Sequence, residues 1–446
     1  MFKSQQGLGP VNWIFIGLFT RNRTLSFDYK LMRKLYHNCL LPLATLFASI
    51  ALADPEYESP PTVAARDLVP ATVLSGENYT VDENVATDGF MGTFVIRSKY
   101  GDFECHGREM FYTRLSEVHA LNELEKVSRT KAFAEAIKNA AEEPAKAAVK
   151  IATNPVGSAV QAPLGAARLF GDVMKGAYGA GRSAVNVTKP KENHPKPPPD
   201  REDPIGYNKS RNEWARRICV DPYTSNRVLA IKLNHLAMIS FGTDKVAGAA
   251  IGFGLGALGP IAAWCSWLPD IDEHLLTAPP AEVSKINAAR LRRLGVSRRA
   301  MKPFLANKWF TPTLQIRYVN ALERLKGVDN IAAAMLVAGE VQSEEEARFL
   351  CGCVAMLEHY HTTVAPLRTL TTQAGLPAAV SAGGNLVVAA PADLIAWTPV
   401  SAGFAKLQNK GEPAILCVSG LLTKRAREGF LANGWKVREF SLPFST

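Results

Sequence analysis

One stretch of this chain constrains its fold more than any other, because it cannot contribute to a hydrophobic core. Residues 189–204 read KPKENHPKPPPDREDP and contain only proline and polar or charged side chains. Such a segment stays extended and solvated, since it has too little apolar surface to offset the entropy cost of folding. We therefore predict a linker over residues 183–206, with folded parts of the chain on either side.

On the N-terminal side of this linker, the hydrophobic period changes within a unit predicted over residues 84–182. Residues 90–98 and 102–106 alternate between apolar and polar side chains, which predicts a β-hairpin. Residues 109–137 have apolar side chains near helical spacing, which predicts one long or broken amphipathic helix. Residues 54–83 are rich in proline and polar groups and show neither period, so we expect an extended arm there.

On the C-terminal side, strand-like alternation is missing from residues 207–372, which predicts a central helical domain. Ser343 stands three residues before Glu346, which is the capping-box spacing at the start of a helix. Residues 373–446 change character and predict a small α/β domain, with Thr423 capping a helix between the last two of its strands. The candidate strands are Leu386–Val388, Ala414–Val418 and Trp435–Phe440. The expected fold class is α+β, predominantly helical.

The first 53 residues predict a mis-called start followed by a secretory signal peptide. Met32 opens a segment with Arg33 and Lys34, followed by an uncharged run over Cys39–Ala53. This run is short for a bilayer span, which needs about 20 apolar residues, and it ends in a small-x-small cleavage site. We therefore expect an exported protein, periplasmic or associated with the cell envelope, or secreted, that begins near Asp54. A retained membrane anchor is the alternative.

Export changes how the cysteines and the net charge are interpreted. Removing residues 1–53 takes away six Lys and Arg and one Asp, so the net charge falls from +10 to about +5. Six of the seven cysteines remain, which permits disulfides in an oxidising compartment, although their density is low. We expect one disulfide or none.

Two runs of the sequence resemble a known group of proteins. They are DGFMGTFVIRSKYGDFECHG, residues 88–107, and ILCVSGLLTKRAREGFLANGW, residues 415–435. Both are similar to exported Gram-negative bacterial proteins of unknown function, and the resemblance extends over most of the chain after the signal segment. The resemblance implies export and carries no activity, cofactor or site residue.

The clearest functional signal is a basic segment. Residues 284–322 contain no Asp or Glu, and Gly295 and Ser297 divide the segment into a predicted helix, turn and helix. Crowded positive charge favours an anionic partner. The predicted anion-binding residues are Lys285, Arg290, Arg292, Arg293, Arg298, Arg299, Lys302 and Lys308. The alternative is a solvated helical surface whose charges pair with acids from elsewhere in the fold.

Residues 246–269 are uncharged and have Gly248, Gly252 and Gly256 on one helix face. This spacing allows close helix packing, either in a membrane-spanning helix or in a buried helical hairpin. Residues 270–274, DIDEH, offer metal-binding side chains without a second cluster, so we expect no metal site.

Four other pairs of residues suggest chemistry only weakly. Glu358 and His361 lie on one helix face without matching partners, and Cys351 and Cys353 on that helix favour core positions. Cys105 adjoins His106, but neighbours on a strand face opposite ways. Ser419, with Gly420 after it, follows a predicted strand and offers a weak anion site at the next helix.

These observations favour a non-catalytic protein of the cell envelope that docks on an anionic surface through its basic helical region. The expected partners are lipid headgroups, polysaccharide or an acidic envelope protein, with membrane association and without nucleic acid. We expect no cofactor. The alternatives are a membrane-inserting protein that uses residues 246–269 and an enzyme with an unfamiliar site. No familiar catalytic motif is present in usable form, so an enzyme is less favoured than a binding protein.

Overall fold

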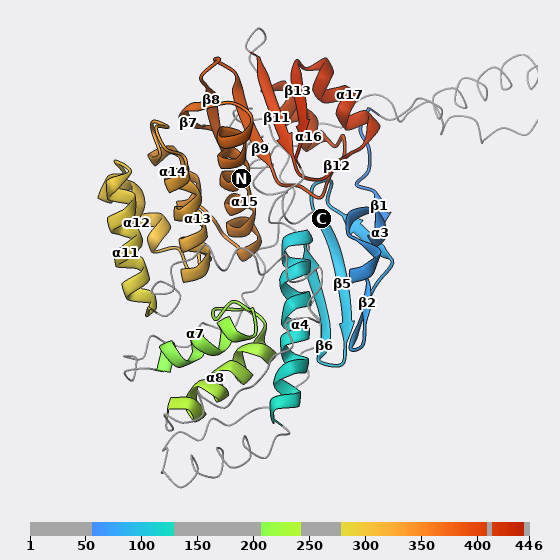
Figure 1. Ribbon diagram of the computed structural model, residues 1–446. Coiled ribbons are helices and arrows are strands. Elements are labelled where there is room, and N and C mark those ends of the chain that lie inside the picture. The colour runs from blue at the N-terminus through green and yellow to red at the C-terminus, as the bar shows by residue number, and fades with distance from the viewer. Residues whose placement is uncertain (1–55, 129–206, 242–277, 408–412, 441–446) are drawn as a thin grey trace, which may run out of the picture. The chain divides into compact units, whose positions relative to one another are not determined.

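The computed structural model describes residues 56–128, 207–241, 278–407 and 413–440. The elements that it describes belong to one compact unit, Tyr57–Thr446. They include both helices and β-sheets, which confirms the α+β class (Figure 1). The predicted signal segment, linker, glycine-rich stretch and DIDEH cluster lie outside the described residues.

A six-stranded antiparallel sheet, sheet A, is built by the N-terminal strands. Its central hairpin pairs β5 (Gly92–Ser98) with β6 (Gly101–His106), which confirms the predicted β-hairpin. The other edge of β5 pairs with β4 (Asn84–Thr87) near one end and with β3 (Tyr79–Val81) near the other. The order is completed by β1 (Thr62–Ala64) beside β4 and β2 (Ser75–Gly76) beside β3.

The extended arm predicted over residues 54–83 is therefore wrong for most of its length. Besides β1, β2 and β3, this segment contains helix α3 (Ala65–Leu68) and a 3-10 turn at Ala71–Val73. These elements are only two to four residues long, so no hydrophobic period can develop in the sequence. Their apolar side chains still join a core beneath sheet A, together with Phe94 and Phe111.

Helix α4 (Arg108–Ser128) follows sheet A directly and confirms the predicted long helix as far as Ser128. Its first half packs on sheet A, and its second half contacts the helical pair formed by the next two helices. That pair consists of α7 (Tyr207–Arg217) and α8 (Arg227–Phe241). Trp214 and Leu233 of the pair share a small core with Leu121 of α4.

Five helices follow within the described residues 278–363. They are α11 (Pro280–Arg293), α12 (Arg298–Leu305), α13 (Pro312–Arg324), α14 (Ala332–Gly339) and α15 (Glu344–Thr363). The predicted cap at Ser343 is confirmed, because its side chain accepts from the backbone N–H of Glu346. The Glu346 carboxylate accepts from the backbone N–H of Gln342, one residue before the position that a capping box requires.

A five-stranded mixed sheet, sheet B, follows α15 in the order β13-β11-β9-β8-β7. The three predicted strands are β9 (Leu386–Ala390), β11 (Ala414–Val418) and β13 (Trp435–Glu439), and they run parallel. Thr423 caps α17 (Lys424–Ala432) between the last two, so the predicted β-α-β unit is confirmed.

The sequence did not predict the remaining elements of this region. They are β7 (Leu367–Gln373), β8 (Leu376–Ser381), β10 (Leu394–Ile395), α16 (Pro399–Lys406) and β12 (Leu421–Leu422). The boundary predicted between residues 372 and 373 falls inside β7. One continuous core also joins Phe304 and Leu357 of the helices with Val388 and Trp435 of sheet B.

The start of the described chain is hydrogen bonded to its last part. The Glu58 carboxylate accepts from the backbone N–H of Trp397 and from the Thr423 hydroxyl, both at 2.6 Å. The backbone N–H of Glu58 donates to the carbonyl of Trp397 at 2.8 Å. Because Thr423 also caps α17, Glu58 links the N-terminal segment to the β-α-β unit.

Candidate functional site

The basic segment forms the helix, turn and helix that its sequence predicts. Pro280 at the first position of α11 suits a helix start, where the missing N–H has no intrahelical partner. Gly295, with a φ of +78°, makes the turn after α11, and the Ser297 hydroxyl then accepts from the backbone N–H of Ala300 to cap α12. Met301 and Phe304 anchor α12 in the core.

Seven of the eight predicted anion-binding side chains are exposed to solvent. We call this group the basic surface, and it consists of Lys285, Arg292, Arg293, Arg298, Arg299, Lys302 and Lys308. The arginines lie in two adjacent pairs on either side of the tight turn, at the end of α11 and the start of α12. Within the described ranges, none of these four arginines forms an ion pair. Lys308 lies over the ring of Trp309, 4.7 Å from its centroid.

The prediction that Arg290, the eighth residue, binds anions is wrong. It is buried, and its guanidinium makes a two-pronged ion pair with the Glu323 carboxylate of α13, at 3.0 and 2.6 Å. Asn287 and Asn320 accept from the same guanidinium. Since these acceptors occupy its donors, Arg290 joins α11 to α13 and cannot reach a ligand at the surface.

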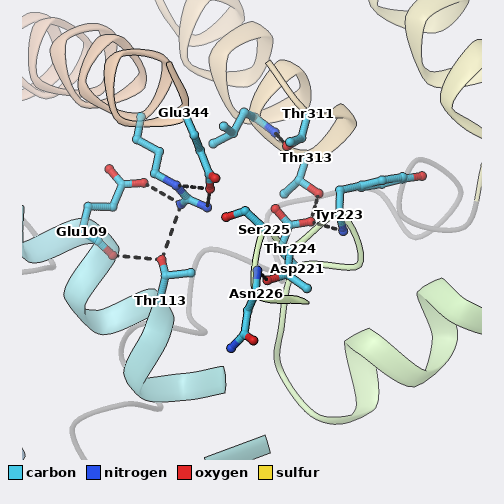
Figure 2. A network of polar contacts seen from close by, with 12 residues as sticks. Glu109, Thr113, Asp221, Tyr223, Thr224, Ser225, Asn226, Thr311, Thr313 and Glu344 are labelled. Atoms are coloured by element: carbon cyan, nitrogen blue, oxygen red, sulfur yellow. Dashed lines mark hydrogen bonds and ion pairs between the residues drawn. The ribbon is translucent and has the colours of Figure 1, made fainter. Parts of the chain in front are cut away.

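The sequence did not predict a buried polar network between α4, α13 and α15. Glu109 of α4 accepts from Arg317 at 2.7 Å. Glu109 also accepts from Arg348 at 3.3 Å, and Glu344 binds the other side of the Arg348 guanidinium at 2.7 Å; Figure 2 labels both carboxylates. Burial alone would lower the pKa of Arg348, but the charges of Glu344 and Glu109 outweigh it and raise that pKa. These ion pairs hold three helices together.

The loop between α7 and α8 enters the same network. The Asp221 carboxylate accepts from the Thr313 hydroxyl and from the backbone N–H of Tyr223, each at 2.8 Å (Figure 2). Burial raises the pKa of Asp221 above its usual value. Thr224 and Asn226 of the same loop bind the buried Glu117 carboxylate of α4.

A second buried ion pair joins sheet A to sheet B. The Asp393 carboxylate, which follows β9, accepts from the backbone N–H groups of Gly92 and Arg108 and from the Arg108 guanidinium at 3.0 Å. The same guanidinium donates to the Ser419 carbonyl at 2.9 Å, at the end of β11. Ser419 therefore contributes to this internal contact rather than standing as an open anion site.

A small cavity of about 40 Å³ lies between these two networks. Its lining includes His106, Arg108, Glu345, Asp393 and Ser419, which come from four separate segments. A cavity of this size has room for roughly three water molecules, whereas sites for small-molecule ligands usually enclose about 300 Å³ or more. The cavity thus gathers polar residues from separate segments, but its volume is far below that of a typical ligand site.

The other residues with suggestive chemistry have structural partners. Glu358 lies 3.7 Å from Arg324, and the His361 ring nitrogen Nδ1 accepts from the backbone N–H of Leu367 at 2.9 Å. Burial raises the pKa of the Cys105 thiol to about 12, so it stays protonated beside His106.

No disulfide joins the described cysteines. The thiols are those of Cys105, Cys219, Cys351, Cys353 and Cys417. Among the described residues, no group of three or more His, Cys, Asp or Glu side chains is placed to hold a metal ion. None of the described helices has the length and apolar character that a bilayer crossing requires.

Comparison of the chain with protein-family models, curated proteins and solved structures gave no match. The geometry of the basic surface is therefore the starting point for a functional proposal.

Proposed function

We propose that this protein is an exported, non-catalytic component of the cell envelope that docks on an anionic surface through its basic surface. The observation that carries the proposal is the row of four exposed arginines, Arg292, Arg293, Arg298 and Arg299, without an ion pair in the described part of the chain. Arg290 shows that this fold pairs a basic side chain with an acid where the role is structural.

Electrostatics supports an external partner for these charges. Like charges on neighbouring side chains repel one another, and an anionic partner removes that repulsion. Each Lys or Arg near a negatively charged bilayer contributes about 1 kcal/mol to binding, so four arginines contribute about 4 kcal/mol. Export, if the signal segment acts as predicted, brings the basic surface to lipids, polysaccharide or acidic proteins rather than to nucleic acid.

The test reverses these four charges. We expect the R292E/R293E/R298E/R299E variant to bind vesicles that contain phosphatidylglycerol roughly a thousandfold more weakly than the unchanged protein, measured by cosedimentation at low salt. Binding of the unchanged protein should also weaken as salt is added, because salt screens exposed charges.

A matched control reverses four exposed basic residues on other elements, in the variant R368E/K424E/K436E/R438E. Its net charge changes by the same amount, so it should retain most of the binding if the basic surface is specific. Equal loss in both variants would show a general charge effect, and retained binding in the first variant would remove the proposal. Mass spectrometry of the mature N-terminus tests export separately, with a start near Asp54 expected.

A further inference from the structure

One exposed apolar side chain stands apart from the rest of its helix. Leu336 of α14 is 63% exposed, the largest value among the large hydrophobic side chains of the described residues. Met335 and Val337 on either side of it are buried, as are Ala334 and Ala338. Exposure of an isolated leucine is common, so its meaning depends on what surrounds it.

The helix that carries Leu336 packs against α12, which contributes Arg298, Arg299 and Lys302 to the basic surface (Figure 1). A Cβ atom added to Gly339 of α14 would lie 2.7 Å from the Cβ atom of Pro303. Leu336 precedes Gly339 by three residues, which places both on neighbouring positions of one helix face. Pro303 directly follows Lys302, so the exposed leucine and the exposed basic residues of α12 belong to adjoining helices.

The combination of apolar and basic groups distinguishes among anionic partners. A sulfated or carboxylated polysaccharide offers charge without an apolar layer, so an exposed leucine gains nothing from it. A phospholipid bilayer offers charged headgroups and, a few ångströms deeper, hydrocarbon. Met301 and Phe304 of α12 are buried in the protein and cannot enter the bilayer, whereas Leu336 is the most exposed large hydrophobic side chain among the described residues.

We infer that the partner of the basic surface is an anionic phospholipid bilayer, and that Leu336 inserts at the boundary between headgroups and acyl chains. This inference rests on the proposed docking function and names its partner. The arginines supply most of the attraction, and Leu336 makes binding selective for a bilayer over a soluble polyanion.

The experiment compares two probes and two variants of the full chain. The probes are phosphatidylglycerol vesicles and dextran sulfate, and the variants are Leu336→Ser and the control Leu431→Ser. Leu431 is 54% exposed and belongs to α17, which packs against α16 and β13. We expect Leu336→Ser to weaken vesicle binding roughly tenfold and to leave dextran sulfate binding unchanged.

The outcomes separate the two proposals. Equal vesicle binding by Leu336→Ser and the unchanged protein, with loss in the charge-reversed variant, would overturn the bilayer inference and leave docking in place. Equal weakening by Leu336→Ser and Leu431→Ser would also overturn it. If the charge-reversed variant still binds both probes, docking through the basic surface fails as well. The melting temperature of each variant should stay near that of the unchanged protein, because both leucines are exposed.

Discussion

Replacing Asp393 by asparagine should remove a large part of this protein's stability. The side chain is 3% exposed, and its carboxylate accepts from the backbone N–H of Gly92 at 2.9 Å and from the Arg108 guanidinium at 3.0 Å. Asparagine keeps the shape of aspartate, but it removes the charge that balances a guanidinium whose own side chain is only 11% exposed. The change therefore removes the charge of Asp393 from a largely buried ion pair.

The magnitude follows from these contacts. Breaking a buried ion pair by removing one partner typically costs about 3–5 kcal/mol in the free energy of unfolding. Arg108 keeps its hydrogen bond to the Ser419 carbonyl, and the asparagine oxygen still accepts a hydrogen bond. We therefore expect the lower end, about 3 kcal/mol, which is a large share of the roughly 5–15 kcal/mol that stabilises most folded proteins.

Urea unfolding followed by circular dichroism measures this loss. Asp393→Asn should lower the midpoint without changing the slope of the transition, since the folded structure stays compact. The single variant Arg108→Met and the double variant complete a double-mutant cycle. The losses of unfolding free energy in the two single variants should add to more than the loss in the double variant. A loss below about 0.5 kcal/mol for Asp393→Asn would refute the assignment of this pair as a buried stabilising contact.

Two further outcomes can be checked by thermal unfolding. Gly420→Ala should destabilise the folded protein by about 3 kcal/mol, because the added Cβ atom would lie 2.1 Å from the carbonyl oxygen of Asp393. The control Gly295→Ala should cost only about 1 kcal/mol, because Gly295 has a φ of +78° but open space around it. Burial lowers the pKa of His119 in the folded protein, so the unfolded chain binds a proton at this residue more readily. The contribution of neutral His119 to stability is therefore present above the pKa of the unfolded chain and is lost as the pH falls through the pKa of the folded protein. The melting temperature of His119→Leu should therefore fall less than that of the unchanged protein between about pH 7.5 and pH 5.5. An equal fall in both proteins would contradict this reasoning.

Local signals in the sequence predicted the elements whose causes are local. The hairpin of sheet A and the caps at Ser297, Ser343 and Thr423 each depend on residues within a few positions of one another. The strands β7 and β8 were missed because their sequences, LRTLTTQ and LPAAVS, lack a clear period. Pro377 within β8 also argues against a strand when the sequence is taken alone.

The position of Arg290 could have been predicted with closer attention to helix geometry. One face of α11 carries Val283 together with the residues four, seven and eight positions later, which are Asn287, Arg290 and Leu291. Since Val283 and Leu291 are apolar, that face was the one to expect in the core. Charge alone suggested a surface role, whereas the spacing indicates a buried one.

The pairing of Arg108 with Asp393 could not have been predicted from a single sequence. The two residues are 285 positions apart, and no local pattern relates them. The same is true of Glu109 with Arg348, which are 239 positions apart. Such contacts depend on how whole elements pack, and packing is decided by the sum of many apolar contacts rather than by the residues that end up paired.

The contact of Glu58 with Trp397 and Thr423 affects when the chain can finish folding. Trp397 and Thr423 follow Glu58 by 339 and 365 positions, so a ribosome makes these two hydrogen-bonding partners long after Glu58. Until then the N-terminal segment lacks these stabilising bonds and stays easier to unfold. The N-terminal segment thus gains the stabilisation from Glu58 only once the β-α-β unit has formed.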